Sequence, residues 1–260
     1  MQPNQEMVSI ITPTFNSERF IKDTIESIIA QTYSNWELLI TDDCSSDSTC
    51  DIIENYARND SRIKLYRLAK NRGGGVARSN SIDKAQGRYL AFCDSDDRWL
   101  PNKLEKQLEF MKEKNCCLSY SSYLTCVEED NDVTGIIVCK SSLTYKEECR
   151  DNQIGCLTAL YDTLPYGKIY FPIIRKRQDW GFMVRALEKC GIAYGMKEPL
   201  AIYRVRHGSI SSNKLQLIKY NIRFYIEVLR YSYAKAILKF IFCFLPSYIW
   251  KKRIQSIYNK

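Results

Sequence analysis

The sequence predicts an α/β fold in which a mostly parallel β-sheet is flanked by helices. Two observations lead to this prediction. Short apolar runs of strand length alternate with segments of helical periodicity through the first part of the chain. Polar or acidic residues follow directly after each of these apolar runs. At 260 residues, of which 45% are hydrophobic, the chain is long enough to bury a substantial core.

The expected strands and helices follow one another in regular order. They are a strand at 8–12, a helix at 17–31, a strand at 36–41, a helix at 47–58, a strand at 63–68, a helix at 76–86 and a strand at 89–93. Repeated β-α units of this kind form a parallel sheet that is covered on both faces. The pattern weakens after residue 110, and the next element it predicts is a helix at 180–189, ended by Gly191.

Charge is distributed unevenly along the chain. The net charge is +8, but residues 214–260 contain ten Lys or Arg and only one acidic residue, Glu227. Residues 1–213 are therefore close to neutral, and we expect them to form one domain, followed by a basic amphipathic helical tail at 214–260. A neutral body argues against a nucleic-acid-binding module, which would carry basic and aromatic residues over its surface.

The cysteines and the N-terminus indicate a reducing compartment. There are eleven cysteines, an odd number, without a CxxC pair, and Cys93 lies inside an apolar strand. This usage is typical of a reduced cytoplasmic protein and does not predict a zinc site. The first residues, "MQPNQEMVSI", have no basic region followed by a long apolar run, so we expect no signal peptide.

Three carboxylates, those of Asp94, Asp96 and Asp97, directly follow the strand at 89–93. The other strands are followed by "TPTFN", "DDCSSD" and "NRGGG". Ligands of parallel sheets bind beyond the carboxyl ends of the strands, so these groups should converge at one edge. Clustered carboxylates repel one another unless a cation neutralises them, and oxygen ligands suit Mg²⁺ or Mn²⁺. The chain has neither a GxxxxGK[ST] loop nor a GxGxxG motif after the first strand, so we expect a metal ion to hold a diphosphate here.

In this order, the segments "VSIITPTFN", "LLITDDCSSD", "NRGGGVARSNSIDKAQGRYLAFCDSDDRWLPNKLEKQ" and "RKRQDWGFMVRAL" resemble the family 2 glycosyltransferases. The resemblance implies the GT-A fold, which is Rossmann-like. Three further segments, "IGCLTALYD", "GKIYFPIIRKRQDW" and "LAIYRVRHGSIS", are similar to bacterial enzymes that build O-antigen or capsule repeat units on a lipid diphosphate. Several of those with a DxDD motif are galactosyl- or glucosyltransferases.

The resemblance implies a reaction and its partners. A hexose would move from a UDP-sugar to a hydroxyl of a sugar on an undecaprenyl-type lipid diphosphate, with inversion at the anomeric carbon and with Mn²⁺ or Mg²⁺ as cofactor. The alternative is a nucleotidyltransferase acting on a sugar phosphate. Such an enzyme should have a loop rich in glycine and Lys or Arg after the first strand, which "TPTFNSERF" does not provide.

The resemblance also assigns residues to the donor nucleotide. Thr12 and Pro13 would lie along the base, and Asp43 would accept a hydrogen bond from uracil. Either Arg72 or Arg78 would lie near the base or the diphosphate.

The acidic motif would complete the donor site and hold the metal ion. Asp94 would approach the ribose or the metal, with Ser95 beside it in the nucleotide site. Asp96 would be the direct ligand that bridges to the diphosphate. Asp97 would instead orient its neighbours or cap the next turn.

The resemblance makes Asp179 the general base that deprotonates the acceptor hydroxyl. It is the second residue of the pair Gln178-Asp179, where family members place a carboxylate at a helix start. Partial desolvation beside an apolar neighbour such as Trp180 would suit a carboxylate to this role. The alternative is that Asp179 only caps the helix expected to begin at Trp180.

His207 is the only histidine of the chain and is flanked by Arg204 and Arg206. A lone histidine is often structural. In the family's basic C-terminal loop, these three residues would contact the diphosphate or the metal when the loop closes.

The tail predicts contact with a membrane surface. Its longest charge-free run, 240–250, is about half of the ~20 residues that a bilayer span needs, and Pro246 interrupts it. Ile237, Ile241 and their apolar neighbours recur at helical spacing between clusters of Lys and Arg. This pattern favours a helix lying on the anionic cytoplasmic face of the cell membrane. The alternative is an ordinary amphipathic helix packed on the body.

Overall fold

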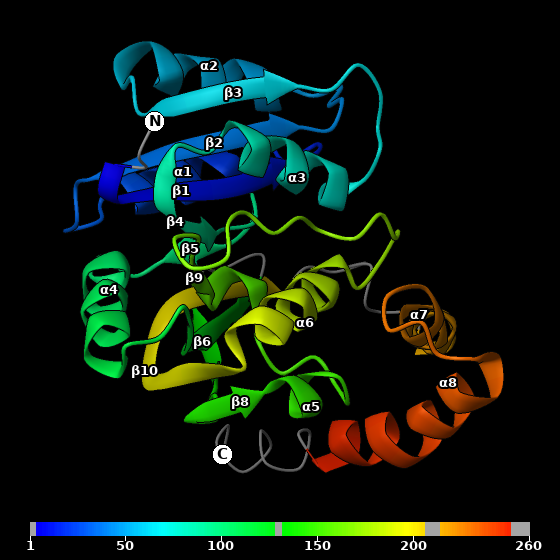
Figure 1. Ribbon diagram of the computed structural model, residues 1–260. Coiled ribbons are helices and arrows are strands. Elements are labelled where there is room, and N and C mark those ends of the chain that lie inside the picture. The colour runs from blue at the N-terminus through cyan, green and yellow to red at the C-terminus, as the bar shows by residue number, and fades with distance from the viewer. Residues whose placement is uncertain (1–3, 128–131, 206–213, 251–260) are drawn as a thin grey trace.

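A ten-stranded sheet runs through the molecule in the order β3-β2-β1-β4-β9-β6-β10-β5, with β7 and β8 paired to β6 and β10 (Figure 1). The structure is a computed structural model that describes residues 4–127, 132–205 and 214–250. Helices cover both faces of the sheet, as the sequence predicts.

The first four strands form the parallel half of the sheet, and their order matches the predicted β-α units. They are β1 (Asn4–Thr14), β2 (Trp36–Asp42), β3 (Ile63–Arg67) and β4 (Gly87–Phe92). All three pairings between them are parallel. The register places Thr14 opposite Asp42, so the polar residues after β1 and β2 lie side by side.

Successive side chains of a strand point to opposite faces of the sheet, so the core has two layers. Ile10 of β1 packs with α1 (Ile21–Ile29) and α2 (Thr49–Asn59) on one face, whereas Ile11 packs with α3 (Gly74–Lys84) and α6 (Gln178–Cys190) on the other. Both isoleucines are fully buried. The parallel strands therefore carry apolar side chains on both faces, as expected for a covered sheet.

The second half of the sheet is mixed, which limits the prediction of a mostly parallel sheet to the first half. β9 (Leu160–Asp162) runs antiparallel to both β4 and β6 (Leu118–Val127). β10 (Ile192–Val205) is parallel to β6 but antiparallel to β5 (Arg98–Trp99) and β8 (Ser142–Thr144). The remaining elements are β7 (Val133–Ile137), α4 (Lys103–Lys114), α5 (Tyr145–Glu148) and a 3-10 helix, Cys156–Thr158.

The helix expected at 180–189 is α6, which begins at Gln178 and ends before Gly191. Its N-cap is Arg177, which has a positive φ of 67° and no side-chain capping bond. Asp179 therefore lies inside the first turn, and the alternative that it caps the helix is wrong.

The tail forms α7 (Lys214–Glu227) and a second helix that starts with α8 (Tyr233–Lys239) and continues to Trp250. Pro246 does not interrupt this helix. A π-helical turn, Phe240–Phe244, precedes the proline in this helix. By length and composition alone, the segment Tyr233–Trp250 could cross a membrane.

One side of the tail packs on the body beside α6 (Figure 1). The indole of Trp180 stacks on the ring of Phe224 with centroids 3.7 Å apart, and Phe244 lies 6.0 Å from the same indole. Phe240 and Phe244 are each 6% exposed. The packing alternative for the tail is thus correct for one of its faces.

Candidate active site

A pocket of about 190 Å³ lies at the carboxyl ends of the parallel strands. Segments that follow β1, β2, β3 and β4 all contribute to it, so the predicted convergence of polar groups is found. The residues that line it are Pro13, Thr14, Phe15, Ser17, Asp43, Gly74, Arg78, Asp94, Ser95 and Asp96.

Asp43 joins the ends of β2 and β3. Its two carboxylate oxygens each accept a 2.7 Å hydrogen bond, from the backbone N–H groups of Arg72 and Gly73. Gly73 has a φ of 90°, which an L-residue rarely adopts, and it is the N-cap of α3. Asp42, in contrast, bonds to the N–H of Ser45 at 2.9 Å and supports the turn after β2.

Of the two candidate arginines, Arg78 faces the pocket. Its guanidinium donates to Asp94 at 2.5 Å, lies 5.3 Å from the ring centre of Phe171, and is 3.5 Å from Oε1 of Gln178. Burial disfavours the charged guanidinium, but the surrounding negative groups, Asp94 foremost, together outweigh this and raise the pKa of Arg78. The side chain of Arg72 is exposed, and only its backbone N–H contacts Asp43.

Gln178 brings α3 and α6 into close contact. A Cβ atom built on Gly75 would lie 2.8 Å from the side-chain carbon Cδ of Gln178, closer than real side chains approach. Gln178 also donates to the carbonyl of Ile174 at 2.6 Å. The glycine run is thus needed for packing against the helix that carries Asp179, as well as for the turn.

The three carboxylates after β4 have different surroundings. Asp94 is paired with Arg78, and Asp96 lines the pocket. Asp97 is 1% exposed and accepts a 3.0 Å hydrogen bond from the backbone N–H of Arg204. Burial, followed by the charges of Asp96 and Asp94, raises the pKa of Asp97 well above its usual range. Asp97 therefore orients the loop, which was one of the two roles expected for it.

Arg204 differs from its expected role as a contact of the diphosphate or the metal. It is 4% exposed, and its guanidinium donates to the backbone carbonyl of Asp96 at 3.0 Å and to Asp23 at 2.9 Å. It therefore fixes the acidic loop from behind. The reason is the pairing of β10 with β5, which places Arg204 next to the loop. His207 and Arg206, expected beside it, lie outside the described residues.

The pocket residues fit a divalent cation that is shared with a diphosphate. Within residues 4–127, 132–205 and 214–250, no cluster of three or more His, Cys, Asp or Glu side chains is arranged to hold a metal ion by itself. Mg²⁺ is commonly bound through one or two carboxylates together with substrate phosphates and water. Asp96 and Asp94, both in the pocket lining, provide such a pair.

Asp179 lies at the edge of this arrangement, in the first turn of α6. Its Oδ2 atom accepts a 3.0 Å hydrogen bond from Nδ2 of Asn152. The carboxylate is half-buried, and its charge contributes to the raised pKa of Arg78, behind the effect of Asp94. The predicted base and the predicted nucleotide site are thus electrostatic neighbours. Asn152 was not expected here.

Thr12, Pro13 and Ser95 differ in how they relate to the pocket. Pro13 and Ser95 line it, whereas Thr12 is fully buried in β1. The sequence interpretation missed Phe15 and Ser17, although both follow β1 directly and the position after a parallel strand could have indicated them. Ser17 bonds to Ser95 at 2.8 Å and so joins the ends of β1 and β4.

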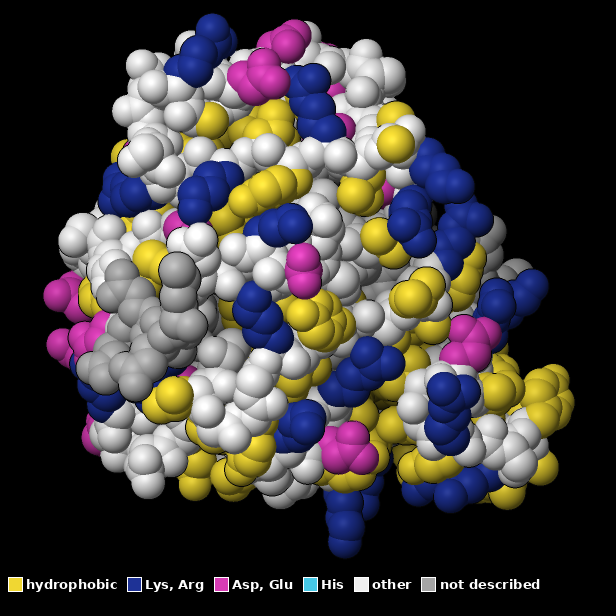
Figure 2. Space-filling view, turned by 45° about the horizontal axis from the view of Figure 1, so that its top comes forward, with side chains coloured by type: hydrophobic (Ala, Val, Ile, Leu, Met, Phe, Trp, Pro, Cys, Tyr) yellow, Lys and Arg dark blue, Asp and Glu magenta, His cyan; other side chains and the backbone are white. Residues whose placement is uncertain are grey.

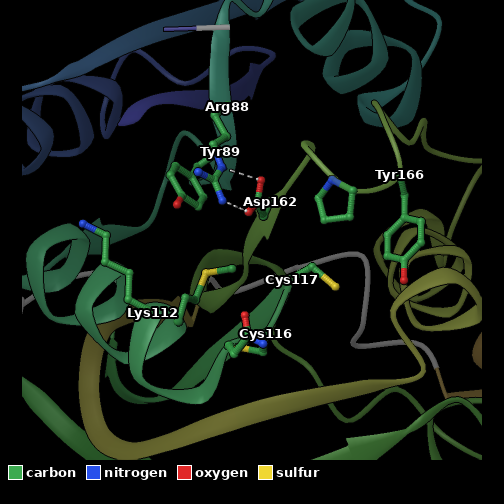
Figure 3. A pocket seen from close by; sticks show the side chains of 10 residues that line it. Arg88, Tyr89, Lys112, Cys116, Cys117, Asp162 and Tyr166 are labelled. Atoms are coloured by element: carbon green, nitrogen blue, oxygen red, sulfur yellow. Dashed lines mark hydrogen bonds and ion pairs between the residues drawn. The ribbon is translucent and has the colours of Figure 1, made fainter. Parts of the chain in front are cut away.

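A larger pocket of about 420 Å³ lies at the opposite end of β4 (Figure 3). The charged groups Arg88 and Asp162 are prominent in its wall, and they form a bidentate ion pair with each other. A second cation, Lys112, pairs with Glu6. These charged groups already have partners within the protein. The larger pocket is therefore not a better candidate for the active site than the pocket at the carboxyl ends of the strands.

Comparisons with known proteins agree with this geometry. Residues 9–188 match the family model described as glycosyl transferase family 2. The chain is 43% identical over 235 residues to TuaG of Bacillus subtilis, a protein named for teichuronic acid biosynthesis, covering 90% of this chain and 93% of the relative. It is 37% identical over 214 residues to WfgD of Escherichia coli, a UDP-Glc:α-D-GlcNAc-diphosphoundecaprenol β-1,3-glucosyltransferase, covering 82% and 83%.

Solved structures share the fold at low sequence identity. The crystal structure of S. aureus TarS 1–349 with UDP-GlcNAc has a TM-score of 0.69 at 23% identity and covers 89% of this chain and 69% of that chain. The mannosyltransferase PcManGT from Pyrobaculum calidifontis, in complex with GDP-Man and Mn²⁺, has a TM-score of 0.57 at 16% identity, covering 90% and 65%.

Proposed function

The chain belongs to glycosyl transferase family 2, and from this premise we propose that it transfers glucose or galactose from a UDP-sugar to a hydroxyl of a sugar on an undecaprenyl-type lipid diphosphate. The product would serve bacterial surface polysaccharide synthesis, as O-antigen or capsule. The name of WfgD supports this donor and acceptor class. The observation that carries the proposal is the pocket that joins Asp43, Arg78 and Asp96 at the ends of the parallel strands.

The nucleotide would occupy the side of the pocket formed after β1 and β2. Pro13 and Phe15 offer apolar surface to the base, and Phe15 is 47% exposed. Asp43 would accept the uracil N–H in addition to its two backbone donors, since a carboxylate has about four acceptor sites. Arg78, which also lines the pocket, would meet the diphosphate or the ribose.

Asp96, with Asp94, would hold Mn²⁺ or Mg²⁺ against the diphosphate. A bound cation of this kind supplies Lewis-acid stabilisation of the departing UDP. Contacts of the buried Arg204 support this role. Arg204 donates to the backbone carbonyl of Asp96 and to the carboxylate of Asp97, and these bonds fix the backbone of the loop. A rigid loop keeps the ligating oxygens in place before the donor arrives.

Asp179 would take the proton of the acceptor hydroxyl. A single base opposite a held leaving group leads to direct displacement, so the product anomer would be inverted relative to the donor. Asn152 and the first turn of α6 position the carboxylate.

The exposed face of the tail would bind the cytoplasmic surface of the cell membrane. The helix from Tyr233 to Trp250 turns Phe240 and Phe244 to the body. Several other apolar side chains of this helix are exposed, namely Tyr233, Leu238, Ile241, Phe242, Ile249 and Trp250. Figure 2 shows hydrophobic side chains together with Lys and Arg on the part of the surface where the tail lies. A helix that is packed along one side suits the interface better than a span.

The nucleotide preference tests the proposal, because GT-A enzymes that use other nucleotides share the fold. In calorimetric titrations with Mn²⁺, UDP should bind more tightly than GDP, and the Asp43→Ala variant should lose this preference. Tighter binding of GDP would contradict the UDP-sugar proposal. No structural observation favours the nucleotidyltransferase alternative.

A further inference from the structure

Asn152 is the neighbour that fixes the carboxylate of Asp179. Its Nδ2 atom donates to Oδ2 of Asp179 at 3.0 Å. We propose that Asn152 is a positioning residue for the transfer reaction, which selects the orientation of the Asp179 carboxylate and leaves Oδ1 for the proton of the acceptor hydroxyl. This inference rests on the proposed role of Asp179 as the base.

The Asp179 carboxylate needs such a partner. The terminal torsion of an aspartate is broad and has no strongly preferred staggered well. Among the residues that the structure describes, Oδ2 accepts a hydrogen bond from Asn152 and Oδ1 accepts none. The single bond from Asn152 therefore distinguishes the two oxygens and defines the plane of the carboxylate.

The segment that carries Asn152 is itself held from two sides. On one side, Nε1 of Trp180 donates to the carbonyl of Glu148 at 2.6 Å. On the other side, the hydroxyl of Tyr225 in α7 donates to the carbonyl of Arg150 at 2.8 Å. Trp180 directly follows Asp179 in α6. Its hydrogen bond to Glu148 therefore connects the helix that carries Asp179 to the segment that carries Asn152.

The chemical type of the donor also suits a base. Hydrogen bonds from charged donors are roughly twice as strong as those from neutral ones. A lysine or arginine at this position would neutralise the carboxylate and weaken it as a proton acceptor. The neutral amide of Asn152 orients Asp179 and leaves its negative charge available for the reaction.

The test compares Asn152→Ala and Asn152→Asp with the full-length protein in the transfer assay. The aspartate keeps nearly the same shape but loses the amide donor and adds a negative charge, whereas the alanine loses the donor without adding charge, so the pair separates hydrogen bonding from packing and charge. For both variants, kcat should fall by roughly 10- to 100-fold, the effect of misplacing a reacting group by about 1 Å. The KM values for donor and acceptor and the calorimetric affinity for UDP should stay near those of the wild type.

A double-mutant cycle identifies the residue through which Asn152 acts. If it acts through Asp179, adding Asn152→Ala to Asp179→Asn should lower kcat by no more than about threefold further. The matched control is Gln153→Ala in the same segment. Gln153 donates its side chain to Asp151 and Ser247, not to Asp179, so this variant should keep kcat.

Three results would overturn the inference. A full additive loss in the double variant would mean that Asn152 acts elsewhere, and a loss confined to the acceptor KM would make it a binding residue. Activity near that of the wild type in Asn152→Asp would indicate a packing role. If Asp179→Asn alone keeps kcat, the proposed base is wrong and the positioning role fails with it, which is a separate and recognisable outcome.

Discussion

The guanidinium of Arg78 lies 2.5 Å from the carboxylate of Asp94 and ties α3 to the acidic loop after β4. This ion pair explains how three carboxylates occupy four consecutive positions. Asp94 forms an ion pair with Arg78, and the buried Asp97 accepts a hydrogen bond from the backbone N–H of Arg204. Asp96 remains in the pocket lining, where a cation and a diphosphate would meet it.

Replacing Arg78 should weaken nucleotide binding. Arg78→Met removes the partner of Asp94 and a cation from the pocket, so the affinity for UDP should fall by about tenfold or more, as for loss of a charged hydrogen bond. The matched control is Arg72→Met, because the side chain of Arg72 is exposed and only its backbone N–H is used. Calorimetry with Mn²⁺ measures both. A loss confined to Arg72→Met would show that the wrong arginine has been chosen, and equal losses would remove the specific role of Arg78.

Asp96 and Asp97 should respond differently to substitution. Asp96→Ala should abolish transfer, because it removes the proposed metal ligand, and it should leave the melting temperature nearly unchanged. Asp97→Ala should cost less activity but lower the melting temperature, since it leaves the N–H of Arg204 without its buried acceptor. EDTA should mimic Asp96→Ala, and Mn²⁺ or Mg²⁺ should restore activity. Full turnover in metal-free buffer would refute the metal role.

Loss of the proposed base should affect the chemical step. Asp179→Asn should lower kcat by roughly two to four powers of ten, the range for a positioned general base, with little change in UDP affinity. Because Asp179 lies inside the first turn and does not cap α6, the variant should remain folded. Circular dichroism and UDP calorimetry check this. An unchanged kcat would exclude Asp179 as the base.

Lys103 should make the free energy of unfolding depend on pH in the neutral to alkaline range. It is fully buried, donates to Gln107 at 2.8 Å, and lies 4.2 Å from the ring centre of Trp99. Burial lowers its pKa from 10.5 to about 7. Between these values the unfolded chain binds the proton and the folded protein does not, so the free energy of unfolding should rise with pH.

Urea unfolding of wild type and Lys103→Met at pH 7, 8 and 9 measures this effect. The wild type should gain roughly 1 kcal/mol per pH unit relative to the variant. The comparison cancels other groups that titrate in the same range. Parallel pH curves for the two proteins would contradict the lowered pKa of Lys103.

The two faces of the tail should separate lipid binding from stability. Phe242 is 70% exposed, so Phe242→Glu should reduce sedimentation with vesicles that contain anionic lipid and leave the melting temperature unchanged. Phe244 is 6% exposed and contacts the cluster around Trp180, so Phe244→Ala should destabilise the protein by about 3 kcal/mol. If Phe242→Glu binds vesicles as well as the wild type does, the membrane proposal for this face is wrong.

The sequence predicted that the residues after the parallel strands meet at one pocket, because this geometry is local. Each parallel strand ends at the same edge, so the residues after β1 to β4 had to meet, and Asp43, Arg78 and Asp96 do. The sequence did not indicate which of Arg72 and Arg78 faces the pocket. This choice depends on the positive φ of Gly73, which starts α3 and turns Arg78 toward the pocket.

The other parts of the site could not be predicted because they depend on pairings between distant segments. β9 is only three residues long and runs against β4 and β6, which no periodicity indicates. The burial of Arg204 follows from the register of β10 with β5, about a hundred positions away in the sequence. The contact of Asn152 with Asp179 likewise joins two segments that carry no common pattern.

Transfer of a hexose to a lipid-linked sugar is the central claim, and mass spectrometry of the acceptor measures it directly. The wild type is incubated with Mn²⁺, a GlcNAc-diphosphate-lipid analogue, and UDP-glucose or UDP-galactose in turn. With one of the two donors, the acceptor should gain the mass of one hexose, and Asp96→Ala under the same conditions should give no product. An acceptor of unchanged mass with both donors, while UDP is released into solution, would contradict the account.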